Sequence, residues 1–301
     1  MNIAFIGLGV MGNPMAHNLI VSGQHKVVVF DIDPVKAVNL EGMGANLAGS
    51  VAEAVKSSDL VMTSLPGPKQ VAAVAFGDDG LFANCKANAS WIDLSTNNLD
   101  VCKQISEAAR SKQIEWLDAP VSGGDEGAQA GNLTILVGGE KSTYNRLLPV
   151  LKVIGEGITH LGPSGAGYSA KIAQVILCYL HSLALSEALM LGIKGGVEAS
   201  QMLSIIQNST GKSYVADRYG PAILNGDYDP SFTVGLAHKD MKLAQEMAEN
   251  LGINLPMCNL TTDTYARAID QYGFDANHLK AVRLLEEDNQ TFLQTKSGDS
   301  I

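Results

Sequence analysis

Residues 3–12 read Ile-Ala-Phe-Ile-Gly-Leu-Gly-Val-Met-Gly, a short apolar run followed at once by three glycines. The run Ile3–Ile6 is typical of a buried strand. Gly7, Gly9 and Gly12 match the G-x-G-x-x-G spacing of a dinucleotide-binding turn. Gly7 permits the tight turn, Gly9 lets the backbone approach a pyrophosphate, and Gly12 lets the next helix pack closely against the strand. The segment therefore predicts the strand, turn and helix that open a dinucleotide-binding domain.

The residues after this turn strengthen the prediction. A helix expected from about Met11 would direct its free N–H groups and the positive end of its dipole at phosphates. A second expected strand, Lys26–Phe30, ends at Asp31, nineteen positions after Gly12. A carboxylate at this place accepts hydrogen bonds from the ribose hydroxyls of an adenosine, and a solvated loop aspartate is the alternative.

Charge at the end of the second strand distinguishes between two cofactors. Asp31 and Asp33 would repel the 2′-phosphate of NADP, and no arginine stands beside the strand end to offset them. The sequence therefore predicts NAD as the cofactor.

Length and composition restrict the function classes. A chain of 301 residues with 46% hydrophobic and 17% charged residues predicts an ordinary globular protein of two domains. A net charge of −10 argues against nucleic-acid binding, which needs a basic stripe. The four cysteines and six histidines are scattered, so we expect neither a metal site nor a disulfide framework. Reduced cysteines and a first strand that begins within two residues of Met1 favour a cytoplasmic protein without a signal peptide.

Short apolar or β-branched runs alternate with helical patterns through the first half of the chain. This alternation predicts an α/β Rossmann-type doubly wound sheet, mostly parallel, with helices on both faces. The later strands are expected at 26–30, 60–64, 91–94, 115–118 and 134–137, and intervening helices at 34–43, 50–56 and 99–113. Ligands of such sheets bind beyond the carboxyl ends of the strands, where Leu65-Pro66, Ser95-Thr96 and residues 121–124 would lie.

The pattern changes from Gly165 onward. A long apolar run with helical periodicity covers Ala166–Ile193, and polar residues such as Gln174 and Glu187 interrupt it. A buried central helix is therefore a better interpretation than a membrane span. Further helices are expected at 197–207, 212–224, 237–251, 256–272 and 277–293, which predicts an all-α C-terminal domain.

These patterns predict the organisation of the chain. An NAD-binding Rossmann domain covers residues 1–163, and a long interdomain helix covers residues 164–195. An all-α domain for substrate binding and oligomerisation covers residues 196–294. The polar tail, residues 295–301, is expected to fray.

A second motif, Asp118-Ala-Pro-Val-Ser-Gly-Gly124, ends an expected strand in a serine and two adjacent glycines. Exposed N–H groups in such a turn form a nest for a carboxylate, and the Ser122 hydroxyl adds a donor. A tight turn that needs glycine for its positive φ is the alternative.

Lys171 stands among apolar residues in the first turns of the long expected helix. Apolar surroundings disfavour the charged form of a lysine and suit it to proton transfer. Gln174 and Val175 lie one turn further along roughly the same face. By itself the lysine also fits the wet edge of a helix, and Phe232 and the charged pair Lys239-Asp240 are equally open to a structural interpretation.

Taken together, the motifs resemble those of the β-hydroxyacid dehydrogenase family, in the same order and over nearly the whole chain. The matching stretches are Gly7–Gly12, Leu65-Pro66, Ser95-Thr96, Asp118–Gly124, Gly165–Lys171 and Lys239-Asp240. The resemblance implies hydride transfer between a small 3-hydroxy acid, or its semialdehyde, and a nicotinamide cofactor. It also implies a homodimer or homotetramer.

The resemblance assigns a role to each candidate residue. Lys171 is the expected general acid/base. Expected to bind a small carboxylate or other small anionic substrate are Ser122, Gly123, Gly124, Gln174, Phe232 and Asp240. Expected to bind the cofactor are Gly7, Leu8, Gly9, Val10, Met11, Gly12, Asp31, Leu65, Pro66, Thr96 and Lys239.

Two positions depart from the family's pattern. Val175 stands where members commonly carry Asn, and Asn97-Asn98-Leu99 replaces a frequent Ile-Ser-Pro. Both departures bear on which substrate is used. Two other functions remain open at this point, an imine reductase and a non-catalytic nucleotide-sensing module. Imine reductases of this fold usually replace the lysine, and a non-catalytic module would be favoured by its loss. The presence of Lys171 therefore argues against both functions.

Overall fold

The computed structural model describes residues 1–294, and the tail predicted to fray lies outside the described residues. Contacts between residues divide the chain into two compact units, Met1–Lys171 and the segment from Ile172 onward. The division falls inside the long helix α9 (Ala166–Lys194), within the segment predicted as an interdomain helix. Each unit contains its own apolar clusters.

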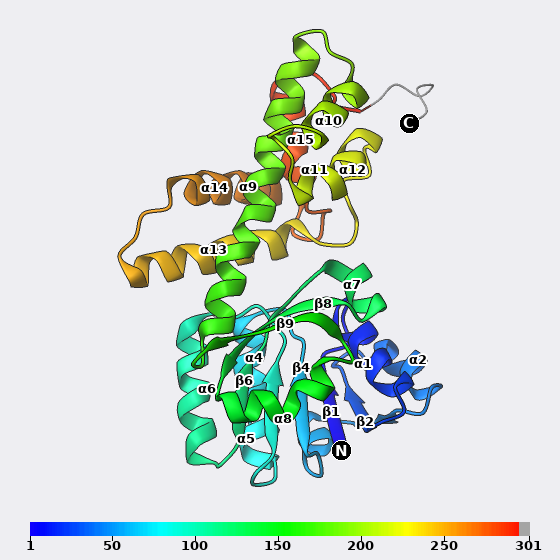
Figure 1. Ribbon diagram of the computed structural model, residues 1–301, viewed down its shortest axis with the longest axis vertical. Helices are drawn as coiled ribbons and strands as arrows, with labels where there is room; N and C mark the ends of the chain where they lie inside the picture. The colour runs from blue at the N-terminus through cyan, green and yellow to red at the C-terminus, as the bar shows by residue number, and fades with distance from the viewer. Residues whose placement is uncertain (295–301) are drawn as a thin grey trace. The chain divides into compact units, whose positions relative to one another are not determined.

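One nine-stranded sheet forms the centre of the first unit (Figure 1). The strands are β1 (Asn2–Ile6), β2 (Lys26–Phe30), β3 (Asn46–Leu47), β4 (Leu60–Thr63), β5 (Ser90–Asp93), β6 (Glu115–Asp118), β7 (Val121–Ser122), β8 (Leu133–Gly139) and β9 (Gly155–Gly162). Their order is β3-β2-β1-β4-β5-β6-β8-β7, and β9 pairs with β8. Ile6 is opposite Phe30 on one side and Thr63 on the other, so three carboxyl ends meet beside β1. The order of strands reverses there, which is the usual ligand position in such sheets.

Helices cover both faces of this sheet (Figure 1). They are α1 (Gly12–Val21), the 3₁₀ helix η1 (Pro34–Ala37), α2 (Val38–Glu41), α3 (Val51–Val55), α4 (Pro68–Phe76), α5 (Leu81–Asn84), α6 (Leu99–Ser111), α7 (Gly124–Ala130) and α8 (Lys141–Leu151). Successive strand side chains point to opposite faces, so Phe5 packs with α1 and α8 whereas Ile6 packs with α3, α4 and α6. The predicted Rossmann-type fold is thereby confirmed.

The far edge of the sheet differs from the sequence prediction. β8 runs antiparallel to β6 and β7, and the unpredicted strand β9 then pairs with β8 in parallel. Three glycines in β9, at 155, 157 and 162, hide its alternation of buried and exposed residues. The helix predicted at 34–43 is instead the short pair η1 and α2, because Asp33 caps a 3₁₀ turn that opens at Pro34.

The second unit consists of helices. Together with the greater part of α9, these are α10 (Ala199–Gln207), α11 (Tyr214–Arg218), α12 (Gly220–Asn225), α13 (Val234–Leu251), α14 (Pro256–Tyr272) and α15 (Lys280–Asp288). Its β pairing in the described residues is a single bridge between Thr233 and Asn277. The helix predicted at 212–224 divides at Tyr219, because Pro221 lacks an N–H and starts a new helix at its first turn.

By length and composition alone, α9 is long and apolar enough to cross a membrane. About a third of its most apolar 18-residue window (33%) is buried within this single chain. Its buried residues include Ile172, Val175 and Tyr179 in one apolar cluster and Leu189 in another. The helix therefore contributes to both apolar clusters of the helical unit, but within this single chain it is less buried than the central helix that the sequence predicts.

Candidate active site

The glycine turn opens the helix α1 at the end of β1. Gly7 has φ +92°, and the N–H of Gly7 donates to the carbonyl of Phe30 at 2.9 Å. A Cβ atom on Gly12 would lie 1.9 Å from the carbonyl oxygen of Gly7, so only glycine fits there. A Cβ on Gly9 would meet no atom within 4 Å, and Gly9 is exposed. The turn therefore presents open backbone at its middle glycine, which fits a cradle for a dinucleotide.

Asp31 lies directly beside this turn, at the end of β2. Its carboxylate accepts the N–H of Leu8 at 2.7 Å and the N–H of Asp33 at 2.9 Å. The ammonium of Lys36 lies 3.5 Å from the same carboxylate. Sequence reasoning considered only arginine as an offsetting cation and missed Lys36, which the 3₁₀ helix brings back toward Asp31. Two main-chain donors nevertheless hold the carboxylate at the glycine turn.

Leu65, Pro66 and Thr96 follow the neighbouring strands β4 and β5. The N–H of Leu65 donates to the hydroxyl of Ser95 at 2.9 Å, so the loops after the two strands are joined. Pro66 is exposed, while Leu65 and Thr96 are half-buried. These residues lie at the carboxyl edge of the sheet, the same edge as the glycine turn.

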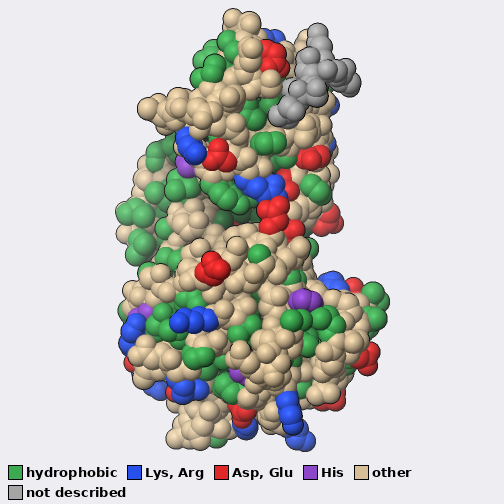
Figure 2. All heavy atoms as spheres, turned by 45° about the vertical axis from the view of Figure 1, so that its right-hand side comes forward, with side chains coloured by type: hydrophobic (Ala, Val, Ile, Leu, Met, Phe, Trp, Pro, Cys, Tyr) green, Lys and Arg blue, Asp and Glu red, His purple; other side chains and the backbone are tan. Residues whose placement is uncertain are grey.

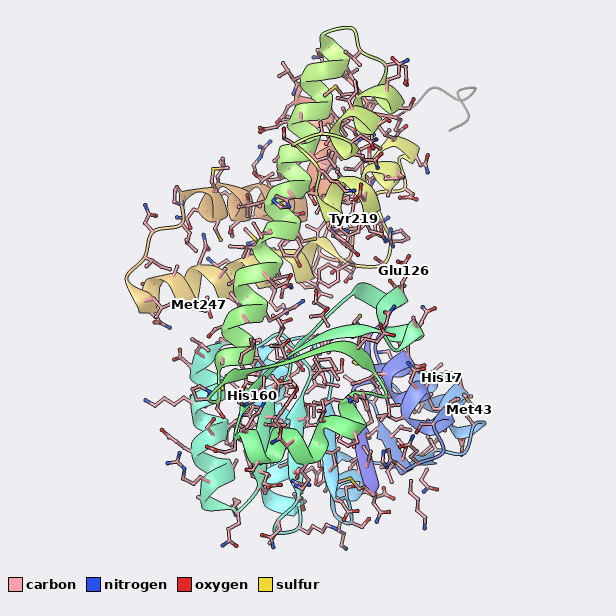
Figure 3. All side chains as sticks on the ribbon, in the orientation of Figure 1. His17, Met43, Glu126, His160, Tyr219 and Met247 are labelled. Carbon is pink, nitrogen blue, oxygen red and sulfur yellow. The ribbon has the colours of Figure 1, made fainter. Side chains whose placement is uncertain are left out.

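The Ser122-Gly123-Gly124 turn joins the edge strand β7 to α7. Gly123 and Gly124 have φ +137° and +67°, and both glycines are exposed. A tight turn with positive φ is by itself a sufficient reason for glycine at these two positions. Asp125 and Glu126 follow in the first turn of α7, where Figure 3 labels Glu126. Acidic side chains are favourable at the N-terminal end of a helix, so α7 by itself explains their presence without a ligand.

Asp118 has a structural function that sequence reasoning did not assign. Its carboxylate accepts the N–H of Gly165 at 2.8 Å and the N–H of Tyr168 at 3.0 Å, which caps the start of α9 from the end of β6. A Cβ on Gly138 would lie 2.6 Å from this carboxylate, and one on Gly167 would lie 2.9 Å from it. Two glycines therefore enclose the Asp118 carboxylate and let the start of α9 approach the sheet.

Burial raises the pKa of Asp118 from 3.8 to about 6, against the opposing effect of the main-chain N–H groups that bind the carboxylate. At neutral pH the group is therefore ionised and both of its oxygens accept hydrogen bonds. A signal for this role is present in the sequence, since Asp118 precedes the glycine turn and Gly165 opens the helix. The sequence does not show that the two segments meet.

Lys171 lies one turn after Tyr168 on α9, and 8% of the lysine is exposed. This burial argues against the alternative of a lysine at the wet edge of the helix. Val175, at the position where the family commonly has Asn, belongs to an apolar cluster of the helical unit. Gln174 is exposed instead, because it is rotated by about 100° from Val175 around the helix.

Phe232 and the Lys239-Asp240 pair belong to the helical unit. The ring of Phe232 is half-buried and lies edge-on to His278, with ring centres 6.0 Å apart. Tyr219, labelled in Figure 3, packs edge-on against the same His278 ring at 4.9 Å. Phe232 is therefore part of a packed aromatic group.

The carboxylate of Asp240 is buried between two partners. One oxygen lies 2.8 Å from the ammonium of Lys239, and the other accepts the hydroxyl proton of Tyr179 at 2.8 Å. Tyr179 comes from α9 and was not among the predicted site residues. Its pKa is raised well above the usual value of 10 by burial and by the Asp240 charge, so it stays a donor.

The predicted residues fall into two groups. The first unit holds the glycine turn, Asp31, the loops after β4 and β5, the Ser122 turn and Lys171, all in residues 1–171. Gln174, Phe232, Lys239 and Asp240 lie in the helical unit. Among residues 1–294, no group of three or more His, Cys, Asp or Glu side chains is arranged to hold a metal ion.

Comparison with known proteins identifies both halves of the chain. Residues 2–162 match the family model described as the NAD binding domain of 6-phosphogluconate dehydrogenase. Residues 165–285 match the model described as NAD-binding of NADP-dependent 3-hydroxyisobutyrate dehydrogenase. The 2-(hydroxymethyl)glutarate dehydrogenase of Eubacterium barkeri is 37% identical over 87% of each chain.

Two further proteins are similar over almost their full length. The NAD-dependent L-serine dehydrogenase of Pseudomonas aeruginosa is 35% identical over 96% of this chain and 98% of its own. The structure of the Mycobacterium tuberculosis 3-hydroxyisobutyrate dehydrogenase with L-serine has a TM-score of 0.84 and 32% identity, over 94% of this chain and 98% of that one. The fold, the ordered motifs and these similarities agree, and the chain belongs to the β-hydroxyacid dehydrogenase family of NAD(P)-dependent oxidoreductases.

Proposed function

We propose that this chain oxidises a small 3-hydroxy acid with NAD, or reduces the corresponding semialdehyde, with Lys171 as the general acid/base. The observation that carries the proposal is the position of Lys171. It is 8% exposed and lies on the helical turn next to the one that Asp118 caps. Asp118 ends β6, so the lysine stands at the carboxyl edge of the sheet that also carries the glycine turn.

The first unit fits a dinucleotide. The backbone at Gly9 is open, and Asp31 offers a carboxylate beside the turn. The residues that would hold the cofactor are Gly7, Leu8, Gly9, Val10, Met11, Gly12, Asp31, Leu65, Pro66 and Thr96. When bound, the nicotinamide supplies the acceptor or donor of a hydride.

The chain itself moves a proton and holds the substrate. In the oxidation, Lys171 in its neutral form accepts the proton of the substrate hydroxyl. In the reduction, the ammonium returns that proton to the carbonyl oxygen. The Ser122 hydroxyl and the N–H groups of Gly123 and Gly124 are assigned to the substrate carboxylate, because such donors bind anions when their glycines have positive φ.

NAD is the proposed cofactor rather than NADP. Two main-chain N–H groups hold the carboxylate of Asp31 at the turn, so a 2′-phosphate would approach an acidic side chain that is fixed there. Lys36 lies 3.5 Å from Asp31 and reduces this repulsion without removing it. The side chain of Lys36 is 45% exposed, so water screens its charge.

Residues of the helical unit complete the proposed assignment. Gln174, Phe232 and Asp240 are assigned to the substrate and Lys239 to the cofactor. Lys239 and Asp240 form a pair in which the side chain of Lys239 keeps 25% of its surface exposed and that of Asp240 5%. This difference suits Lys239 to meet a ligand and Asp240 to orient it.

The compounds in the names of the similar proteins indicate which class of substrate to propose. L-Serine, 3-hydroxyisobutyrate and 2-(hydroxymethyl)glutarate all carry a hydroxyl on the carbon β to a carboxylate. We therefore propose a substrate with this arrangement. One hydroxyl then meets Lys171 while the carboxylate binds the Ser122 turn.

The proposed setting is a cytoplasmic homodimer or homotetramer without nucleic-acid or membrane partners. Leu177 and Leu191 on α9 are 48% and 78% exposed, which favours association with another copy of the chain. The four cysteines are free, which suits a reducing compartment. On the face drawn in Figure 2, Lys and Arg side chains are scattered among Asp and Glu instead of forming a stripe.

A substrate and cofactor screen tests this proposal. Purified protein is assayed with NAD and NADP against L-serine, 3-hydroxyisobutyrate and 2-(hydroxymethyl)glutarate, and in reverse with a cyclic imine and NADPH. We expect NAD-linked oxidation of at least one hydroxy acid and loss of about 10³-fold or more in kcat for Lys171→Ala. Turnover that survives in this variant contradicts the proton-transfer role. Imine reduction alone would favour the rival enzyme class, and NADH binding without any turnover would favour a nucleotide sensor.

A further inference from the structure

Asp93, at the end of β5, is completely buried and is the centre of a hydrogen-bond network in the first unit. One carboxylate oxygen accepts the hydroxyls of Thr63 and Ser95, each at 2.6 Å. The other oxygen accepts the hydroxyl of Tyr168 at 2.6 Å. All three distances are at the short end of the range for O–H···O hydrogen bonds.

The direction of these bonds follows from their outer partners. The hydroxyl of Thr63 accepts the indole N–H of Trp91 at 2.9 Å, and the hydroxyl of Ser95 accepts the main-chain N–H of Leu65 at 2.9 Å. An indole or main-chain N–H can only donate, so each hydroxyl accepts that N–H with one lone pair and has its own proton available for Asp93. Asp93 therefore accepts from all of its partners.

This carboxylate is costly to the fold. Burial raises the pKa of Asp93, against the opposing effect of the hydroxyls of Ser95, Thr63 and Tyr168 and of the main-chain N–H of Ser95. Within the described residues, no lysine, arginine or histidine forms an ion pair with it. Desolvation of a buried carboxyl group is unfavourable, and replacing such a group and its partners by apolar groups of the same shape can be neutral or stabilising. Its presence calls for a reason other than stability.

The network joins two parts of the proposed active site. Through Ser95 it holds the N–H of Leu65, in the loop assigned to the nicotinamide side. Through Tyr168 it holds the first turn of α9, three residues before Lys171. Asp118 accepts main-chain N–H groups of the same turn. The turn is therefore held at its backbone by Asp118 and at the Tyr168 side chain by Asp93.

We propose that Asp93 and Tyr168 are positioning residues that hold Lys171 in register with the cofactor loops. The proposal rests on the function proposed for Lys171 and extends it to the residues that align the lysine. Neither residue needs to touch the substrate. Their effect comes through the placement of the proton-transferring group, to which reaction rates are sensitive at the scale of about 1 Å.

Tyr168→Phe tests the link to Lys171, because it removes one hydroxyl and keeps the buried ring. The matched control is Tyr144→Phe in the same unit, whose hydroxyl makes only a 3.5 Å contact with the carbonyl of Ile158. Each variant is assayed with NAD and either L-serine or 3-hydroxyisobutyrate, whichever the wild type oxidises faster, protonated and deuterated at the carbinol carbon.

We expect Tyr168→Phe to lower kcat about tenfold and to raise the deuterium isotope effect on kcat, because misplacement slows the chemical step. A smaller folded fraction would lower kcat but leave the isotope effect unchanged. The control is expected to match the wild type in both. An unchanged kcat and isotope effect in Tyr168→Phe would overturn the proposal.

Asp93→Asn tests the link to the cofactor loop by a readout that needs no substrate. The side-chain amide of this variant has an NH₂ group in place of one acceptor oxygen, and this group would face hydroxyl donors. Because Ser95 links Asp93 to the N–H of Leu65, we expect the Leu65 loop to lose its alignment. We expect the Kd for NADH, measured by fluorescence titration, to rise at least about threefold, while Tyr168→Phe leaves it unchanged. Equal NADH affinity in Asp93→Asn and the wild type contradicts the role of Asp93.

The wild type and Lys171→Ala separate this proposal from the proposed function. A wild type that oxidises none of the three hydroxy acids of the screen refutes the proposed function, and NADH affinity then decides the role of Asp93. An active wild type, an inactive Lys171→Ala and an unaffected Tyr168→Phe leave the function standing and refute the positioning role.

Discussion

Tyr179 on α9 donates its hydroxyl proton to Asp240 on α13 at 2.8 Å, in the interior of the helical unit. The other oxygen of the same carboxylate lies 2.8 Å from the ammonium of Lys239. The buried tyrosine thus fixes the orientation of a carboxylate that in turn holds a partly exposed lysine. This connects the helix that carries Lys171 with the pair that the family pattern assigns to ligand binding.

Removal of the Tyr179 hydroxyl should destabilise the protein. Tyr179→Phe leaves a buried carboxylate oxygen without its donor, so the free energy of unfolding in urea should fall by about 1–3 kcal/mol. The control is Tyr219→Phe in the same unit, which keeps the ring contact with His278 and leaves the Tyr179–Asp240 hydrogen bond in place. Equal stability of the two variants would contradict the assigned contact.

The contribution of Asp118 to the free energy of unfolding should decrease as the pH rises from about 4 to 6. Burial raises the pKa of Asp118 from 3.8 to about 6. Between these values the folded chain retains a proton that the unfolded chain has lost, so the contribution decreases by about 3 kcal/mol and is level above pH 6. Urea unfolding at several pH values measures the change.

Asp118→Asn isolates this contribution, because an amide does not titrate. The variant should lack the fall between pH 4 and 6. At pH 7 it should also be less stable, because its NH₂ group would face the N–H of Gly165 or of Tyr168. A pH dependence that is unchanged in Asp118→Asn would assign the effect to other groups.

Two glycines of the first turn should respond differently to alanine. A Cβ at Gly12 would lie 1.9 Å from the Gly7 carbonyl, whereas one at Gly9 would meet no atom within 4 Å. Gly12→Ala should therefore lower the free energy of unfolding by several kcal/mol, about 3 or more. Gly9→Ala should keep the stability of the wild type and weaken NADH binding, since the added methyl group occupies the open backbone.

Thermal unfolding and NADH fluorescence titration distinguish these outcomes. NADH binding that is unaffected in Gly9→Ala would remove the glycine turn from the proposed cofactor site.

Asp31 and Lys36 should set the preference between NAD and NADP in opposite directions. Asp31→Asn removes the negative charge and keeps an acceptor for Leu8, so the ratio of kcat/KM for NADP over NAD should rise about tenfold, equivalent to about 1.4 kcal/mol. Lys36→Ala should lower that ratio by a smaller factor, because the lysine is half exposed. An unchanged ratio in Asp31→Asn contradicts the cofactor assignment.

Regular patterns made most of the fold predictable. β1, β2, β4, β5 and β6 follow from short apolar runs, and α9, α13 and α14 follow from long helical periodicity. The edge strands β7 and β9 were missed, because a two-residue strand and a glycine-rich one carry little alternation. The division at Tyr219 was missed because Pro221 is compatible with the start of a helix as well as with its interruption.

By itself the sequence determined the Rossmann-type fold, the helical second half and the family, since local periodicity and the order of short motifs are properties of neighbouring residues. It also singled out Lys171 and Asp31 as candidates. Only the tertiary structure decided the partners that surround them. Asp93 and Tyr168 are 75 residues apart, and Asp118 and Gly165 are 47 apart. The buried carboxylates acquire their roles because the folded sheet brings distant donors to them, and no local pattern records which donors these are.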